Sequence, residues 1–134
     1  MFTRRKIWQV GGYVGAMNAP RDPDCLFCKI VAGEIPADVV HETDTTLAFR
    51  DIEPQAPTHV LVIPRTHHVD ASTLAENEPD TAVDLLNAAS DIARQEGLGE
   101  GYRLVFNTGR AANQLVFHAH LHVLGGRQMT WPPG

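Results

Sequence analysis

The sequence contains few cysteines, no excess of basic residues and no long apolar run. Only two of its 134 residues are cysteines, in a C-x-x-C pair, so a disulfide framework of the kind found in small secreted proteins is not expected. The formal net charge of −5 argues against a nucleic-acid-binding surface and a polybasic membrane anchor. No stretch of about 18 apolar residues occurs, so no transmembrane helix is predicted. These absences favour a cytoplasmic protein that binds neither nucleic acid nor membrane.

The length and composition are those of one ordinary globular domain, with 43% hydrophobic and 20% charged residues. Residues 1–20 differ from the rest, because a basic start is followed by a glycine-rich, weakly apolar run. An export signal is one interpretation of this segment, but glutamine and glycine interrupt its apolar part. We interpret residues 1–20 as a loose extension and residues 21–134 as the folded domain.

Hydrophobic patterns predict an α+β domain with an antiparallel sheet. A long helix is predicted over residues 79–96, where apolar residues recur at steps of three and four, and a short helix over 25–32. Short β-branched or alternating runs predict strands at residues 39–41, 45–49, 59–63, 102–106 and 115–124. This order of elements favours an antiparallel sheet with the long helix on one face.

Three histidines alternate with apolar residues in the last predicted strand: His118, His120 and His122. Because strand side chains alternate between faces, all three share one face, with neighbours about 6.6 Å apart and the outer pair about 13 Å apart. One metal ion is not easily bound by all three, so we expect them to have different roles along one groove. Imidazole can be a nucleophile, an acid–base group or a metal ligand. The central position of His120 favours nucleophilic attack at phosphorus.

The segment from residue 118 to residue 124 resembles the signature of the histidine triad (HIT) superfamily. The tail VLGGRQMTWPPG, residues 123–134, is similar to the C-terminus of the Hint branch, the nucleoside phosphoramidases. The matching segments upstream follow the same order as in that branch: 34–37, 48–52, 54–59, 62–64, 101–103 and Asn107. The resemblance covers about residues 24–134, so it does not depend on one short motif.

This resemblance implies a fold and a reaction. The fold is a five-stranded antiparallel sheet with one long and one short helix, and the sheet is extended across a homodimer. The reaction is hydrolysis of the P–N or a related bond of purine nucleoside 5′-phosphoramidates, which releases a mononucleotide such as AMP or GMP. His120 would be the nucleophile and form a nucleotidyl-histidine intermediate. His122 would contact the phosphate and help protonate the leaving group, and His59 would complete the cluster.

The resemblance also implies residues that hold the nucleotide. Asp51 would bind the ribose hydroxyls, and Asn107 and the backbone near Gln114 would hold phosphate or ribose. The wall around the base would consist of Phe27, Ile30, Ile35, Phe49 and Ile52, and Trp131 would reach the partner subunit's site. By themselves, these apolar residues fit a plain core equally well, Asp51 fits a turn, and Trp131 fits an exposed chain end.

The pair Cys25 and Cys28 leaves a metal knuckle, a redox pair and two buried free thiols open. Some HIT proteins carry a structural zinc, and the resemblance implies Cys25, Cys28, His67 and His118 as its ligands here. His68 is a rival for the adjacent His67. Two thiolates and two neutral imidazoles balance the charge of Zn²⁺ and form a closed structural set.

Leu115 departs from the family pattern, because close relatives often carry a serine there that can touch the scissile bridging atom. Arg50 also replaces a neutral or histidine side chain beside Asp51. The loss of a hydrogen bond at position 115 keeps open a nucleotide-binding regulatory protein with little catalysis. A dinucleoside polyphosphate hydrolase is the other alternative, although the tail at residues 131–134 favours the Hint branch.

Overall fold

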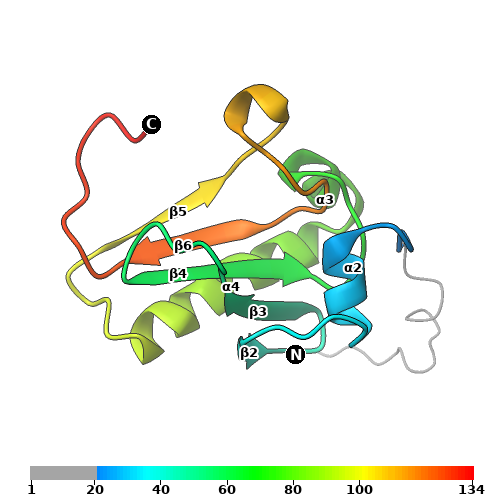
Figure 1. Cartoon of the computed structure of the whole chain (residues 1–134), viewed down its shortest axis with the longest axis horizontal. Helices are drawn as coiled ribbons and strands as arrows, with labels where there is room; N and C mark the ends of the chain where they lie inside the picture. The colour runs from blue at the N-terminus through cyan, green and yellow to red at the C-terminus, as the bar shows by residue number, and fades with distance from the viewer. Residues whose placement is uncertain (1–20) are drawn as a thin grey trace.

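The computed structural model describes residues 21–134, so the interpretations of residues 1–20 as an extension or an export signal lie outside the described residues. Five strands form one antiparallel sheet in the order β2-β3-β4-β6-β5 (Figure 1). Their bounds are β2 Val39–Glu42, β3 Thr46–Arg50, β4 Thr58–Pro64, β5 Tyr102–Phe106 and β6 Leu121–Gly125. The predicted α+β architecture with a five-stranded antiparallel sheet is confirmed.

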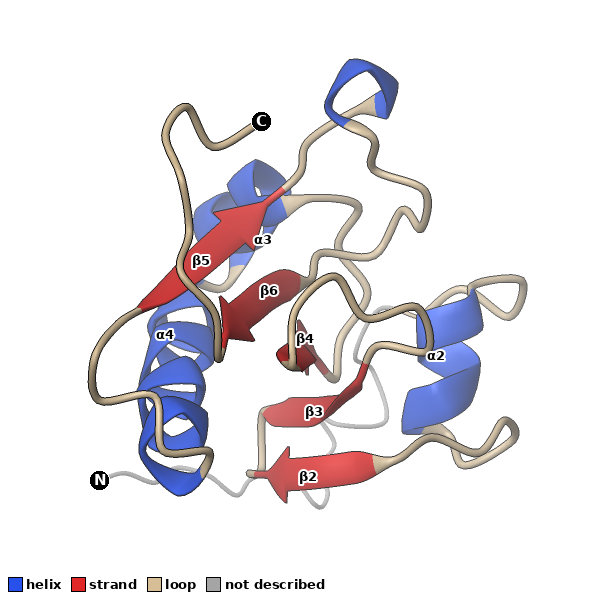
Figure 2. Ribbon diagram, turned by 60° about the vertical axis from the view of Figure 1, so that its left-hand side comes forward, coloured by secondary structure: helices blue, strands red, loops and turns tan. Residues whose placement is uncertain are grey.

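Helices α2 (Leu26–Val31) and α4 (Pro79–Gln95) lie on opposite faces of this sheet (Figure 2). They are the predicted short and long helices. The structure adds α3 (Ala71–Asn77) and a short 3-10 helix, η1 (Arg110–Ala112). The sequence pattern missed α3 because its seven residues bury only Leu74 and so carry no apolar stripe. Within the described part of the chain, no helix combines the length and apolarity needed to cross a bilayer.

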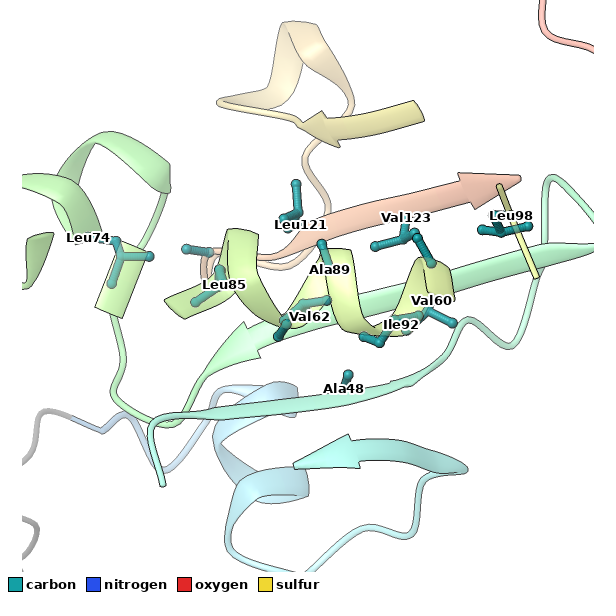
Figure 3. Packing of buried hydrophobic residues seen from close by; sticks show 13 residues of the cluster. Ala48, Val60, Val62, Leu74, Leu85, Ala89, Ile92, Leu98, Leu121 and Val123 are labelled. Atoms are coloured by element: carbon teal, nitrogen blue, oxygen red, sulfur yellow. The ribbon is translucent and has the colours of Figure 1, made fainter. Parts of the chain in front are cut away.

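The larger core lies between α4 and the sheet (Figure 3). Strand alternation directs every second side chain of β4 and β6 toward α4, and the helix supplies a matching stripe at three- and four-residue spacing. The fully buried members of this core include Val60, Val62, Leu85, Ala89, Ile92, Leu121 and Val123. Each large apolar side chain buried in this way contributes about 1.5–3 kcal/mol relative to an exposed one.

The opposite face of the sheet carries the histidines. Leu61 and Ile63 of β4 pack there in a second cluster with Phe27 and Cys28, and His59 shares their face because it alternates with the α4-facing residues. Leu61 pairs directly with His122 across the two central strands. The fold therefore places His59 and His122 diagonally across neighbouring strands, beside α2.

The last strand is shorter than predicted, because β6 begins at Leu121 instead of residue 115. Its pairing with both neighbours begins there: Leu121 is paired with Val62 of β4 on one side and with Phe106, the last residue of β5, on the other. Upstream, the Ala119 N–H donates to the His68 carbonyl oxygen at 2.7 Å. Ala119 and Leu121 still belong to the α4-side core, so the predicted alternation of histidine and apolar residues persists beyond the ladder.

Candidate active site and metal centre

Cys25, Cys28, His67 and His118 converge from three separate segments. The Cys28 sulfur lies 3.4 Å from His67 Nδ1 and 3.6 Å from His118 Nδ1, and the Cys25 sulfur lies 3.5 Å from His118 Nδ1. The two Nδ1 atoms are 3.3 Å apart. Tetrahedral Zn²⁺, with Zn–S of about 2.3 Å and Zn–N of about 2.0 Å, would separate sulfur from nitrogen by about 3.5 Å and nitrogen from nitrogen by about 3.3 Å. The donor atoms therefore stand where a zinc ion requires them.

The hydrogen bonds of this cluster also suit a metal. Nε2 of His118 lies 2.9 Å from the Pro64 carbonyl oxygen, which only accepts, so the ring proton is on Nε2 and Nδ1 is free to bind a cation. Burial lowers the pKa of His118 to about 4, which keeps the ring neutral. Burial raises the pKa of the Cys28 thiol to about 11, so a thiolate here needs a cation beside it. The predicted zinc cofactor is confirmed.

His68 does not compete with His67 for this site. Its ring is buried and its Nε2 lies 2.7 Å from a carboxylate oxygen of Glu78. Glu78 is the residue that joins α3 to α4. His68 therefore fastens the two helices, and its backbone carbonyl holds Ala119.

His120 is oriented by the backbone of the preceding turn. Its Nδ1 lies 2.7 Å from the His118 carbonyl oxygen, so Nδ1 carries the proton and donates it. Nε2 is then the atom with the free electron pair. Burial lowers the pKa of His120, which keeps this pair available near neutral pH. The geometry suits a nucleophile whose base form needs no separate activating group.

His59 and His122 form a hydrogen-bonded pair with a defined direction. The Gln55 backbone N–H donates to Nδ1 of His59 at 3.0 Å, so the neutral His59 ring carries its proton on Nε2. That N–H donates to Nδ1 of His122 at 2.9 Å, which places the His122 proton on Nε2. Nε2 of His122 is buried and has no partner among residues 21–134. It is therefore a donor without an acceptor, beside the His120 ring at 5.0 Å between centroids.

Asp51 joins the same pair, with one carboxylate oxygen 3.4 Å from His59 Nε2. Asp51, His59 and His122 thus resemble a second metal set. The 2.9 Å separation between the two histidine nitrogens is, however, that of a hydrogen bond, and the proton on His59 Nε2 occupies the position a metal would need. We therefore interpret these three residues as a hydrogen-bond relay.

Burial of the pair keeps it neutral. Burial and, to a smaller extent, the neighbouring His120 and His59 lower the pKa of His122 to about 4. Burial also lowers the pKa of His59, against the opposing charge of Asp51. Both rings therefore act as neutral hydrogen-bonding groups at physiological pH.

The residues expected around a base fall into two groups. Phe27 and Phe49 are buried, stack edge to face at 5.5 Å, and belong to the second cluster. Phe27 also contacts the His120 ring edge at 5.1 Å between centroids. Ile30 and Ile35 are half-buried, whereas Ile52 is 95% exposed. Phe27 therefore packs against His120 with Phe49 behind it, whereas the side chain of Ile52 is exposed to solvent.

The remaining expected residues occupy different surroundings. Gln114 is buried, and its side chain accepts from the Gly109 N–H and donates to the Val69 and Val116 carbonyl oxygens. Its backbone N–H donates to the Gly109 carbonyl oxygen at 3.0 Å, so Gln114 holds the loop. Asn107 is half-buried directly after β5. Trp131 is 82% exposed near the chain end.

Neither Leu115 nor Arg50, the two departures from the family pattern described above, is a member of the relay. Leu115 is 78% exposed. Arg50 forms a two-pronged ion pair with Glu96 at the end of α4. Arg50 therefore ties β3 to α4 and has a structural role.

Two backbone groups of the site were not predicted: the Gln55 N–H and the Pro64 carbonyl oxygen. Sequence motifs identify side chains, whereas a main-chain group is not distinguished by the residue type that carries it. The available signal was that both lie in segments, 54–59 and 62–64, that match the family pattern in order.

Comparisons with known proteins agree with this site. Residues 32–129 match the HIT domain family. The chain is 48% identical over 117 residues to adenylylsulfatase HINT1 of Arabidopsis thaliana, covering 86% of this chain and 80% of that protein. It is 48% identical over 121 residues to the 14 kDa zinc-binding protein of Zea mays, covering 89% and 94%.

The fold of this chain is also similar to that of a solved structure. The crystal structure of a HIT family hydrolase from Legionella pneumophila has a TM-score of 0.79 and 54% identity, covering 83% of this chain and 100% of that one. The chain therefore belongs to the HIT family of hydrolases, in its Hint-like group.

Proposed function

We propose that this chain hydrolyses the P–N or a related bond of purine nucleoside 5′-phosphoramidates through a nucleotidyl-His120 intermediate. One observation carries the proposal: a nucleophilic Nε2 on His120 stands beside an unpartnered N–H donor on His122. A nucleophile and a donor side by side suit displacement at a phosphorus centre whose oxygens and leaving group accept hydrogen bonds.

The reaction has two halves. Nε2 of His120 bonds to phosphorus while the P–N bond breaks and its electron pair leaves on the amine nitrogen. His122 Nε2–H donates toward the phosphoryl group and helps to protonate the departing amine. Water then attacks the phosphohistidine, gives the mononucleotide, restores His120, and supplies the proton that returns to His122. His59, held by Asp51 and Gln55, keeps His122 in the donor form.

The nucleotide would lie across the histidine face of the sheet. We assign Asp51 to the ribose hydroxyls, and Asn107 with the backbone near Gln114 to phosphate or ribose. The base would contact the wall formed by Phe27, Ile30, Ile35, Phe49 and Ile52. The name of the Arabidopsis relative supports an adenylyl group on the phosphorus, and it makes adenylyl sulfate a second candidate substrate.

We assign the zinc ligands as Cys25, Cys28, His67 and His118. Four protein ligands leave no open coordination position, so the ion's chemistry would be structural. The ligands join α2, the segment after β4 and the segment before β6. The backbone of His118 in turn orients His120, so the metal centre supports the nucleophile without touching substrate.

We further propose a homodimer through β5 and the adjacent flank of α4. One flank of α4 faces β2 and β3, since Asp84 accepts from the Thr45 hydroxyl there. Val83 and Leu86 lie on the other flank and are exposed. Tyr102 and Leu104 of β5 are exposed as well, and β5 is an edge strand of the sheet in the described part of the chain, residues 21–134.

A charge at this surface tests the homodimer. Leu104→Asp should yield a monomer in sedimentation velocity, whereas wild type sediments as a dimer. Val39→Asp is the matched control, because Val39 is similarly exposed, 41% against 38%, on the opposite edge strand. A monomeric wild type, or dimers in Leu104→Asp, would overturn this interface.

The activity is tested with a fluorogenic adenosine 5′-phosphoramidate, with wild type beside His120→Ala. We expect turnover in wild type, a loss of at least about 10³-fold in the variant, and AMP binding in both. Adenylyl sulfate and a diadenosine polyphosphate serve as parallel substrates. AMP binding without turnover of any of them would favour the regulatory alternative, which the exposed, apolar Leu115 motivates. Equal turnover in the variant would refute the mechanism.

A further inference from the structure

The turn after β6 lies against the loop that precedes β4. Thr58 pairs with Gly125, and a Cβ atom at Gly126 would lie 2.9 Å from the Pro57 Cβ. Gly126 also has a φ of +90°, which favours glycine. This close approach places the next residue, Arg127, beside the same loop.

The Arg127 guanidinium binds the backbone of that loop. Its Nε and Nη2 donate to the Gln55 carbonyl oxygen at 3.3 and 3.2 Å, and Nη1 donates to the Gln128 carbonyl oxygen at 3.3 Å. The N–H of the same Gln55 donates to Nδ1 of His59 at 3.0 Å. Gln55 is thus held at both of its backbone polar groups, by Arg127 on one side and by His59 on the other.

We propose that Arg127 is a positioning residue that fixes the tautomers of His59 and His122 through the backbone of Gln55. This inference rests on the proposed function, because it concerns the donor that His122 offers to substrate. With Gln55 held, Nδ1 of His59 stays an acceptor and its Nε2–H points at His122. With Gln55 released, Nδ1 of His59 is open to a proton, and the direction of the relay is no longer defined.

The surroundings of His59 explain why this control is needed. Asp51, from the loop after β3, lies 3.4 Å from its Nε2. His122 of β6 lies 2.9 Å away, and the His120 ring lies beyond it. Asp51 is the one carboxylate in this group and would stabilise a His59 cation. The Gln55 N–H opposes that cation, because it occupies the nitrogen that would take the second proton.

Arg127→Gln and Arg127→Lys test the proposal, with Arg103→Gln as the matched control. Arg103 donates to the Thr130 carbonyl oxygen at 2.9 Å, so it anchors the same tail and carries the same charge without touching Gln55. The readouts are imidazole ¹⁵N NMR of the full chain, kcat, KM, and the pH profile of kcat. In wild type we expect a bare Nδ1 and a protonated Nε2 on His122.

Arg127→Gln should change the ring ¹⁵N signals of His59 and His122 and move the acid limb of kcat to higher pH. We expect kcat to fall about three- to ten-fold at neutral pH, as for a weakened hydrogen-bond chain, with KM nearly unchanged. Arg127→Lys, which still donates and keeps the charge, should recover part of the loss. Arg103→Gln should leave all of these readouts at wild-type values.

Three results would overturn the inference. One is a wild-type His122 with its proton on Nδ1. Another is an Arg127→Gln variant whose ring ¹⁵N signals and acid limb of kcat are unchanged and whose kcat falls no more than that of Arg103→Gln. That result would mean that Arg127 only anchors the tail. The third is an Arg127→Lys variant as impaired as Arg127→Gln. A wild type without turnover would refute the proposed function instead, and the NMR comparison would still decide the relay.

Discussion

Removal of one thiolate tests how much the metal centre contributes to stability. Cys28 is almost fully buried, and its sulfur is within 3.6 Å of the Nδ1 atoms of both His67 and His118. The ligands connect distant parts of the chain: 39 positions separate Cys28 from His67, and 51 separate His67 from His118. In Cys28→Ser the hydroxyl is a poor zinc ligand, so the link between α2 and the rest of the site opens.

The size of the effect follows from the loop that opens. For a cross-link, chain entropy gives about 4 kcal/mol for closing a loop of either length. This is a large share of the roughly 5–15 kcal/mol by which a domain is stable. In a domain of this length each kcal/mol moves Tm by about 3 to 4 °C, so we expect Cys28→Ser to lower Tm by about 10 to 15 °C.

The assay is calorimetry of wild type and Cys28→Ser, each before and after a chelator, with the metal content measured in parallel. We expect about one zinc per wild-type chain, a chelator-induced fall of wild-type Tm to near that of the variant, and no chelator effect on the variant. His68→Gln is the control, because His68 pairs with Glu78 and is no ligand; its zinc content should match wild type. A Cys28→Ser protein that keeps one zinc per chain, or a wild-type Tm that ignores the chelator, would refute the reasoning.

Two further predictions concern acid and the core. Burial lowers the pKa of His122 to about 4, so below about pH 6.5 the unfolded chain binds a proton that the folded chain does not. The contribution of His122 to the free energy of unfolding is therefore fully present above pH 6.5 and decreases toward pH 4, by at most about 1.4 kcal/mol per pH unit. Urea unfolding of His122→Asn should show a smaller decrease of this free energy with falling pH than wild type. An equal decrease in the two proteins would contradict the assignment. Ile92 is fully buried between α4 and the sheet. In the same assay, Ile92→Ala should lower the free energy of unfolding by about 2–5 kcal/mol. A decrease below about 1 kcal/mol would contradict the place of Ile92 in the core.

The predicted elements with a clear local pattern were confirmed, whereas the weaker ones were missed or shifted. The apolar stripe of α4 and the β-branched run of β4 are patterns of residues close together in the sequence. Periodicity therefore predicted a helix at the first and a strand at the second. Helix α3 is only seven residues long and has no stripe. The last strand was overextended because residues 115–120 have the sequence pattern of a strand, whereas the ladders with β4 and β5 include β6 only from Leu121 onward.

By itself the sequence determined which residue types share a face: the alternation of His118, His120 and His122 with apolar residues requires it, because strand geometry is local. The family resemblance added the four proposed metal ligands and the proposed nucleophile. Only the tertiary structure decided which nitrogen carries the proton in His118, His59 and His122, because the groups that set it belong to other segments of the chain. For His120 it is set locally, by the carbonyl oxygen of His118. Pro64 sets it for His118, and Gln55 sets it for His59 and thereby for His122. Main-chain carbonyl groups are the same in every residue, and N–H groups are the same in every residue except proline, so their place beside a ring is fixed by the fold and not by residue identity.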